Sequence, residues 1–204
     1  MLDFDFKLLQ NEDFKEDSVR EGIIMPLLQS FGYTLRGNAI KDIESKHRLE
    51  LVLSQKITSP TIVGSNEKIV LTRYPDYVLY IDSKTHCVLD AKAPNVAINP
   101  HSKAERQAFY YAINPEIKSP YYALCNGRYF LLYETIGQNL LLEIDLESSL
   151  NNLDSNLDLL KQYLTTPLES LRQILSSKAY KPKKDEEWYD SRELPRAIIG
   201  RNFL

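Results

Sequence analysis

Two aspartates and a lysine interrupt an otherwise apolar pair of strand-like runs, and their types suit metal-dependent chemistry. In the stretch YPDYVLYIDSKTHCVLDAKAPN, residues 74–95, Asp76 begins the first run, and Asp90 and Lys92 end the second. Residues two apart share one face of a strand, so Asp90 and Lys92 point the same way, while Cys87, Leu89 and Ala91 point the other way. Two carboxylates held together raise each other's pKa unless a positive charge lies between them. Hard carboxylate oxygens select Mg²⁺ or Mn²⁺ for that role.

The turn between the two runs decides whether Asp76 joins the other two groups. A hairpin centred on Ser83 or on Lys84 places all three charged groups on one face. A turn centred between these two residues would send Asp76 to the opposite face. The turn residues DSKT lack the glycine or Asn-Gly that favours a two-residue loop, so we expect a turn of odd length.

A cation held by this pair would support phosphodiester hydrolysis. It can lower the pKa of a bound water and neutralise charge on a phosphoryl oxygen. Lys92 could orient that water or stabilise the transition state. The alternative interpretation is a cross-strand salt bridge of Asp76 or Asp90 with Lys92 at the rim of a sheet.

The three histidines show no spacing typical of a zinc site: His47, His86 and His101.

Elements that position these residues can be predicted on both sides of the hairpin. Helical periodicity covers residues 17–31, with Gly32 as a stop and Pro26 as a place for a kink or break. We predict strands at 48–54, 68–72, 76–81 and 86–92, with SPTIVGSN as a loop between the first two.

A second helix and a second hairpin follow. Ser102 and Glu105 are expected to form a capping box, in which each side chain accepts from the other's backbone N–H, at the start of a helix that ends near residue 112. Asn126-Gly127 is a turn signal between the next pair of strands. The remaining predictions are strands at 121–125, 129–134 and 140–146, helical pattern from 149 with Pro167 at a helix start, and a weakly structured stretch at 181–204.

This order predicts an α/β fold: a mixed sheet flanked by helices, with a C-terminal helical extension. We place the main domain at 1–146 and the extension and tail at 147–204. Hydrophobic residues make up 43% of the 204, enough for a core. Cys87 and Cys125 lie in apolar runs and are expected to be buried thiols of a reducing compartment.

Charge and motif content narrow the function classes. The acidic N-terminus does not resemble a signal peptide, and no window approaches the roughly 18 apolar residues of a spanning helix, so a cytoplasmic protein without a membrane partner is expected. The net charge of −3 gives no global basic field for nucleic acid. Neither GxGxxG nor GxxxxGK[ST] occurs, which excludes a recognisable nucleotide-driven motor in this chain.

The motif Pro75-Asp76, thirteen residues, then Asp90-Ala91-Lys92 resembles the PD-(D/E)xK nuclease signature. Gln107 and Tyr111, four apart on one helix face, match the QxxxY motif of its RecB-like branch. The segments VREGIIMPLLQSFGY and YYALCNGRYFLLYE look like the N-terminal nuclease domain of type I restriction enzyme R subunits. The resemblance spans roughly residues 10 to 145.

This resemblance implies a restriction-endonuclease-like fold and a Mg²⁺- or Mn²⁺-dependent DNA endonuclease. Asp76 and Asp90 would be metal ligands, with the Ala91 carbonyl as a further ligand, and Lys92 the catalytic lysine. Gln107 and Tyr111 would support the site or contact DNA backbone. Related nucleases often add a first-helix glutamate, for which Glu16 and Glu21 are both candidates. Family R subunits more often carry Glu where this chain has Asp90.

Family R subunits also continue into an ATP-driven translocase, so the implied partners are DNA, with methyltransferase and specificity subunits or a separate helicase or translocase. Two other functions stay open. The chain could be a catalytically weak or inactive DNA- or protein-binding module on the same fold. It could also be another nuclease of the superfamily, such as a repair or junction-resolving enzyme.

Overall fold

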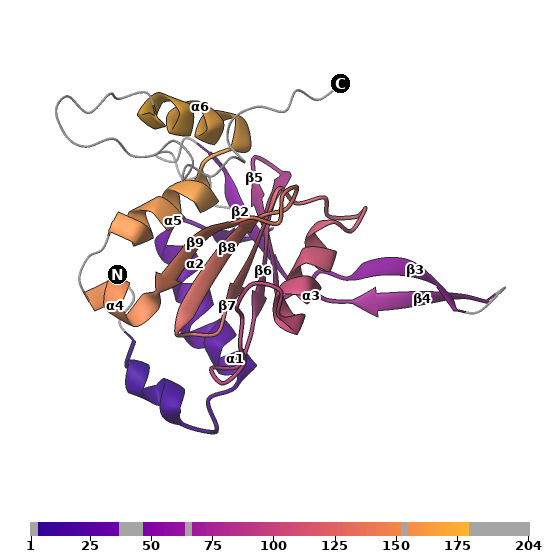
Figure 1. The fold of residues 1–204 in the computed structure, drawn as a ribbon, viewed down its shortest axis with the longest axis horizontal. Helices are drawn as coiled ribbons and strands as arrows, with labels where there is room; N and C mark the ends of the chain where they lie inside the picture. The colour runs from indigo at the N-terminus through magenta and orange to yellow at the C-terminus, as the bar shows by residue number, and fades with distance from the viewer. Residues whose placement is uncertain (1–3, 37–46, 64–66, 152–154, 180–204) are drawn as a thin grey trace.

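The computed structural model describes residues 4–36, 47–63, 67–151 and 155–179, and its centre is one mixed β-sheet (Figure 1). In these residues seven strands pair in the order β1-β2-β5-β6-β7-β8-β9. The pairs β1–β2 and β6–β7 are parallel and the others are antiparallel. The strands are β1 (Thr34–Leu35), β2 (Leu49–Leu53), β5 (Tyr77–Ile81), β6 (Lys84–Ala91), β7 (Tyr121–Cys125), β8 (Tyr129–Glu134) and β9 (Leu140–Asp145).

Helices cover both faces of this sheet. Near the N-terminus lie a 3₁₀ turn, η1 (Phe6–Gln10), then α1 (Glu16–Val19), a π-helical turn, η2 (Arg20–Ile24), and α2 (Met25–Ser30). The later helices are α3 (Lys103–Ala112), α4 (Leu146–Asn151), α5 (Ser155–Thr165) and α6 (Leu168–Ala179). The predicted α/β class, a mixed sheet flanked by helices, is confirmed. None of the helices in the described part of the chain is long and apolar enough to cross a membrane.

Two apolar cores lie on opposite faces of the sheet, because alternate strand residues point to opposite sides. One core joins Leu79 and Leu89 to the continuous helix formed by α1, η2 and α2, here called the first helix, through Ile23 and Leu27. The other joins Val88 and its neighbours to α3. As predicted, Cys87, Leu89 and Ala91 lie in the first core, opposite to the face of Val88 and Asp90. Cys87 and Cys125 are free and fully buried.

The C-terminal helices complete the first core. Leu160, Leu164 and Leu171 are fully buried in the same cluster as the first helix. The Tyr33 hydroxyl also donates to the Leu164 carbonyl at 2.5 Å. The described part of the predicted extension therefore covers the sheet, while the boundary at residue 146 stays a prediction. α6 begins directly after Pro167, as expected, and residues 181–204 lie outside the described ones.

The first helix is interrupted by a π turn. The Met25 N–H donates to the Arg20 carbonyl, five residues earlier. Pro26 has no N–H to continue the regular pattern, and it occupies the first turn of α2, where that donor is not needed. The sequence allowed a kink or a break at Pro26, and the structure has one turn of π-helix just before it.

A second, two-stranded sheet extends from the body (Figure 1). It pairs β3 (Ile57–Val63) with β4 (Glu67–Arg73), in register Ile57↔Arg73. The prediction of a loop over SPTIVGSN, residues 59–66, is therefore wrong for 59–63, and 64–66 lie outside the described residues. The β-branched residues favour a strand, and a two-stranded ribbon tolerates Pro60 because each strand has a free edge.

Candidate active site

The β5–β6 hairpin has a two-residue turn, so the prediction of an odd-length turn is wrong. Ile81 pairs with Lys84, and the two turn residues, Asp82 and Ser83, have φ of 50° and 67°. These left-handed conformations are those of a type I′ turn, which matches the twist of a hairpin. The Asp82 carboxylate supports the turn by accepting from the Arg48 N–H at 2.9 Å.

A β-bulge corrects the register that this even-length turn would impose. Tyr80 pairs with Thr85 but Leu79 pairs with Cys87, so His86 has no partner on β5. Its buried ring contacts the Tyr163 carbonyl of α5 at 2.8 Å. Beyond the bulge Tyr77 pairs with Leu89. Continued by one residue, this register sets Asp76 opposite Asp90.

The three predicted residues meet where β5 begins and β6 ends, and we name Asp76, Asp90 and Lys92 the acid–lysine cluster. Asp76 Oδ2 accepts from the Ala91 N–H at 2.7 Å. The Lys92 ammonium contacts Asp90 Oδ2 in an ion pair. The Lys92 N–H donates to the Cys125 carbonyl at 2.9 Å, which continues β6 along β7. All three residues are buried or nearly so.

Two residues of the first helix reach this cluster. Glu16 Oε2 lies 3.8 Å from Lys92 Nζ. Arg20 Nη1 lies 3.6 Å from Asp76 Oδ1, and Arg20 also pairs with Asp17 at 3.0 Å. Sequence reasoning missed Arg20, although it lies four residues after Glu16 and hence on the same helix face. Glu21 instead lies 3.8 Å from Arg20, so of the two candidate glutamates only Glu16 contacts Lys92 in the described structure.

Burial dominates the electrostatics of the cluster. It raises the pKa of Asp90 to about 7, although the Lys92 ammonium acts in the opposite direction. Burial would lower the pKa of Lys92, but Asp90 and Glu16 outweigh it, so the Lys92 pKa is raised. Burial likewise raises the pKa of Glu16 against the effect of Lys92. Lys92 therefore keeps its proton at neutral pH.

The residues present fit a hard divalent cation. Asp90 Oδ2 is buried against the Lys92 ammonium. Asp76 Oδ1 faces Arg20 only at 3.6 Å, longer than a hydrogen bond. Each of these two oxygens thus faces a cationic side chain of the chain itself, whose place a divalent cation would take. Mg²⁺ commonly uses one or two carboxylates and keeps several waters, so two suffice. Within the four described ranges, no group of three or more His, Cys, Asp or Glu side chains could hold a metal.

The predicted supporting residues lie on α3. The Gln107 amide donates to the Tyr111 hydroxyl at 2.7 Å, so each fixes the orientation of the other. Their action on the cluster or on DNA stays a prediction, as does a ligand role for the Ala91 carbonyl. Ser102 caps the helix by accepting from the Glu105 N–H at 3.0 Å. The reciprocal half of the expected capping box is wrong, because the buried Glu105 carboxylate accepts from the Tyr122 hydroxyl instead.

Comparisons with known proteins give one distant structural likeness. No family model matches the chain. No curated protein matches it either. The chain is similar to a fragment structure from Vibrio vulnificus described as an HsdR subunit of a type I restriction enzyme, with a TM-score of 0.42 and 17% sequence identity. The match covers 63% of this chain and 22% of that one, so this chain spans about a fifth of its length. The fold class rests on the sheet and helices described above.

Proposed function

We propose that this chain is a metal-dependent nuclease domain that hydrolyses DNA phosphodiesters. Asp76 and Asp90 would hold Mg²⁺ or Mn²⁺, with the Ala91 carbonyl as a further ligand. The observation that carries the proposal is the meeting of two buried carboxylates and an ammonium at one end of the β5–β6 hairpin. A bound cation would supply an activated water and neutralise phosphoryl charge.

The chain's own groups have separable tasks in this proposal. The Ala91 N–H holds Oδ2 of Asp76, and Oδ1, which lies 3.6 Å from Arg20, is the oxygen that would bind the metal. Lys92 is charged at neutral pH, because its acidic neighbours raise its pKa. It therefore serves as a donor that orients the attacking water and stabilises negative charge in the transition state, not as a general base. Glu16 lies close enough to hold the Lys92 ammonium in place.

Plasmid cleavage with single-residue variants tests the proposal. Asp76→Ala, Asp90→Asn and Lys92→Met should each abolish nicking of supercoiled DNA in Mg²⁺ or Mn²⁺, while circular dichroism stays native. The matched control is Lys161→Met, since Lys161 is an exposed lysine on α5. Activity equal to wild type in any of the three cluster variants, after purification from a nuclease-deficient host, would refute the assignment.

A second candidate function is a binding module without turnover. It is favoured by one observation: both predicted ligand carboxylates already face cations of the chain itself, Arg20 at 3.6 Å from Asp76 and Lys92 against Asp90. Calorimetric titration with Mn²⁺ separates the two candidates. Binding that is lost in Asp90→Asn supports the nuclease, and no binding in wild type supports the module.

The biological setting is proposed from the sequence resemblance alone. A restriction system would supply methyltransferase and specificity subunits, or a separate helicase or translocase, as partners. A repair or junction-resolving enzyme would instead prefer branched or damaged DNA. Cleavage rates on plasmid, flapped and four-way-junction substrates distinguish these settings, with preference for junctions counting against the restriction role.

A further inference from the structure

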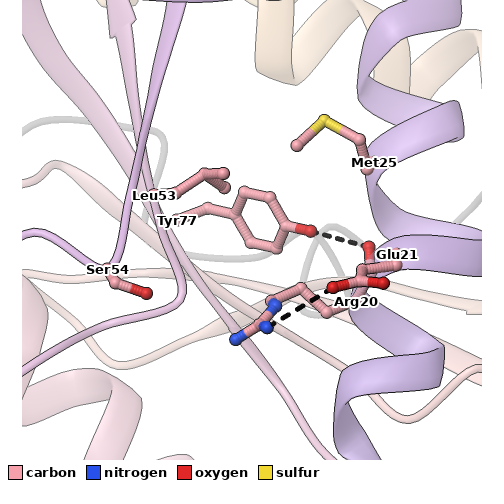
Figure 2. Close-up of a pocket in the computed structure, with 6 residues that line it drawn as sticks. All are labelled: Arg20, Glu21, Met25, Leu53, Ser54 and Tyr77. Carbon is pink, nitrogen blue, oxygen red and sulfur yellow. Dashed lines mark hydrogen bonds and ion pairs between the residues drawn. The ribbon is translucent and has the colours of Figure 1, made fainter.

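A pocket of about 180 Å³ lies between the first helix and the ends of β2 and β5 (Figure 2). Six residues line it: Arg20, Glu21, Met25, Leu53, Ser54 and Tyr77. Figure 2 shows the helix residues on one side and the strand residues on the other, with the Tyr77 ring between them. The Tyr77 hydroxyl donates to the Arg20 carbonyl at 2.7 Å, which ties the two walls together.

This pocket adjoins the acid–lysine cluster directly. Tyr77 is the residue after Asp76, and the Ser54 N–H donates to the Asp76 carbonyl at 2.9 Å. Arg20 lines the pocket and also lies 3.6 Å from the Asp76 carboxylate. A guanidinium has five donors in a planar fork, so Arg20 can face both places at once.

The lining has the chemistry of a site for one planar ring. Met25 and Leu53 supply apolar walls beside the fully buried Tyr77, and Leu53 is 41% exposed. The volume of the pocket is smaller than the roughly 300 Å³ at which pockets for drug-sized ligands begin. It therefore suits a single heterocycle better than a whole nucleotide. Glu21 adds a largely exposed carboxylate, which accepts hydrogen bonds from amino groups.

We propose that this pocket receives one unstacked base of the DNA strand, next to the phosphodiester at the acid–lysine cluster, with Arg20 contacting the intervening phosphate. Enzymes that act on nucleic acid read extruded bases in such pockets by packing and by hydrogen bonds to the base edge. The Glu21 carboxylate favours a base with an exocyclic amino group, as acidic side chains do with cytosine. The inference rests on the proposed function and adds a source of sequence preference that needs no separate reading helix.

The two methionines of the chain make a direct binding test possible. With methyl-¹³C methionine, NMR shows only Met1 and Met25, and Met25→Leu assigns the pocket signal. Titration of wild type with deoxycytidine 3′,5′-bisphosphate should shift the Met25 methyl. The thymidine analogue should bind at least threefold more weakly, and Glu21→Gln should remove that difference.

The second measurement uses a variant in which a larger side chain fills the pocket. Leu53→Trp should weaken the nucleotide at least tenfold and raise the KM for DNA. Leu140→Trp is the matched control, because Leu140 is 37% exposed on β9 at the opposite edge of the sheet, and both values should stay at wild type. Sequencing of cleavage products should show amino-bearing bases enriched beside the cut, and this enrichment should be lost in Leu53→Trp.

Failure of the pocket and failure of the nuclease give different results. If the Met25 methyl does not move with either nucleotide, the pocket proposal is overturned, whether or not wild type cuts DNA. Unchanged KM and end composition in a folded Leu53→Trp variant also overturn it while the nuclease stands. If wild type cuts no DNA in Mg²⁺ or Mn²⁺, the proposed function itself fails.

Discussion

Replacing Asp90 by Asn should stabilise the protein in the absence of metal. Asp90 is 2% exposed, and burial raises its pKa from 3.8 to about 7. Between about pH 4 and pH 7 the folded chain therefore keeps a proton that the unfolded chain has lost. The free energy of unfolding falls as pH rises through this range, and the full penalty is present above about pH 7.

The size of the effect follows from the same pKa. One pKa unit corresponds to about 1.4 kcal/mol, so ionising Asp90 costs the folded protein about 4 kcal/mol more than the unfolded chain. In Asp90→Asn the Lys92 ammonium faces a neutral amide, which offsets part of the gain. We expect a net stabilisation of about 2–4 kcal/mol at pH 8, or a rise in Tm of about 5–15 °C. The difference should shrink toward pH 4.

Urea unfolding followed by circular dichroism at pH 5 and pH 8 measures this difference. Asp158→Asn is the control, because Asp158 is an exposed aspartate on α5 and its replacement should change little. Mg²⁺ should stabilise wild type at pH 8 and leave Asp90→Asn unaffected, since a ligand that binds only the folded state adds to its stability. A variant no more stable than wild type at pH 8 would refute the view that Asp90 is a carboxylate buried at a cost.

Three further predictions concern packing around the site. Burial lowers the pKa of His86, so the unfolded chain takes up protons more readily than the folded chain. The free energy of unfolding of wild type should therefore fall relative to that of His86→Gln as pH drops below about 6.5. Urea unfolding from pH 7 to 5 measures this, and parallel profiles for the two proteins would contradict it. Gly127→Ala should cost about 2 kcal/mol or more by thermal unfolding, because Gly127 has φ of 84° and an added methyl would meet side-chain carbons at 2.9–3.3 Å. Tyr122→Phe removes the hydroxyl that donates to the buried Glu105 carboxylate and should cost about 1–3 kcal/mol in urea unfolding, whereas unchanged stability would show that water replaces it.

Local sequence pattern was sufficient to predict most helices and strands and to name the residues of the acid–lysine cluster. Alternation along 86–92 placed Leu89 and Asp90 on opposite faces, because strand periodicity needs no tertiary information. Ser102 marked the start of α3 for an equally local reason, since its hydroxyl caps an N–H three residues away. The β-branched residues of β3 favour a strand, and the segment was missed because that local signal does not show which other strand it pairs with.

The amino-acid sequence by itself determined which residues could do chemistry and which strand face each would take. Only the tertiary structure decided that they meet. The two-residue turn alone would have set Asp76 on the wrong face, and the bulge at His86, whose ring is anchored to α5 about 77 residues away, restores the register. The choice of Glu16 over Glu21 beside Lys92, and the approach of Arg20 to Asp76, depend in the same way on how the first helix packs against the sheet. Contacts between residues so distant in sequence are set by packing of the whole core, which no local pattern encodes.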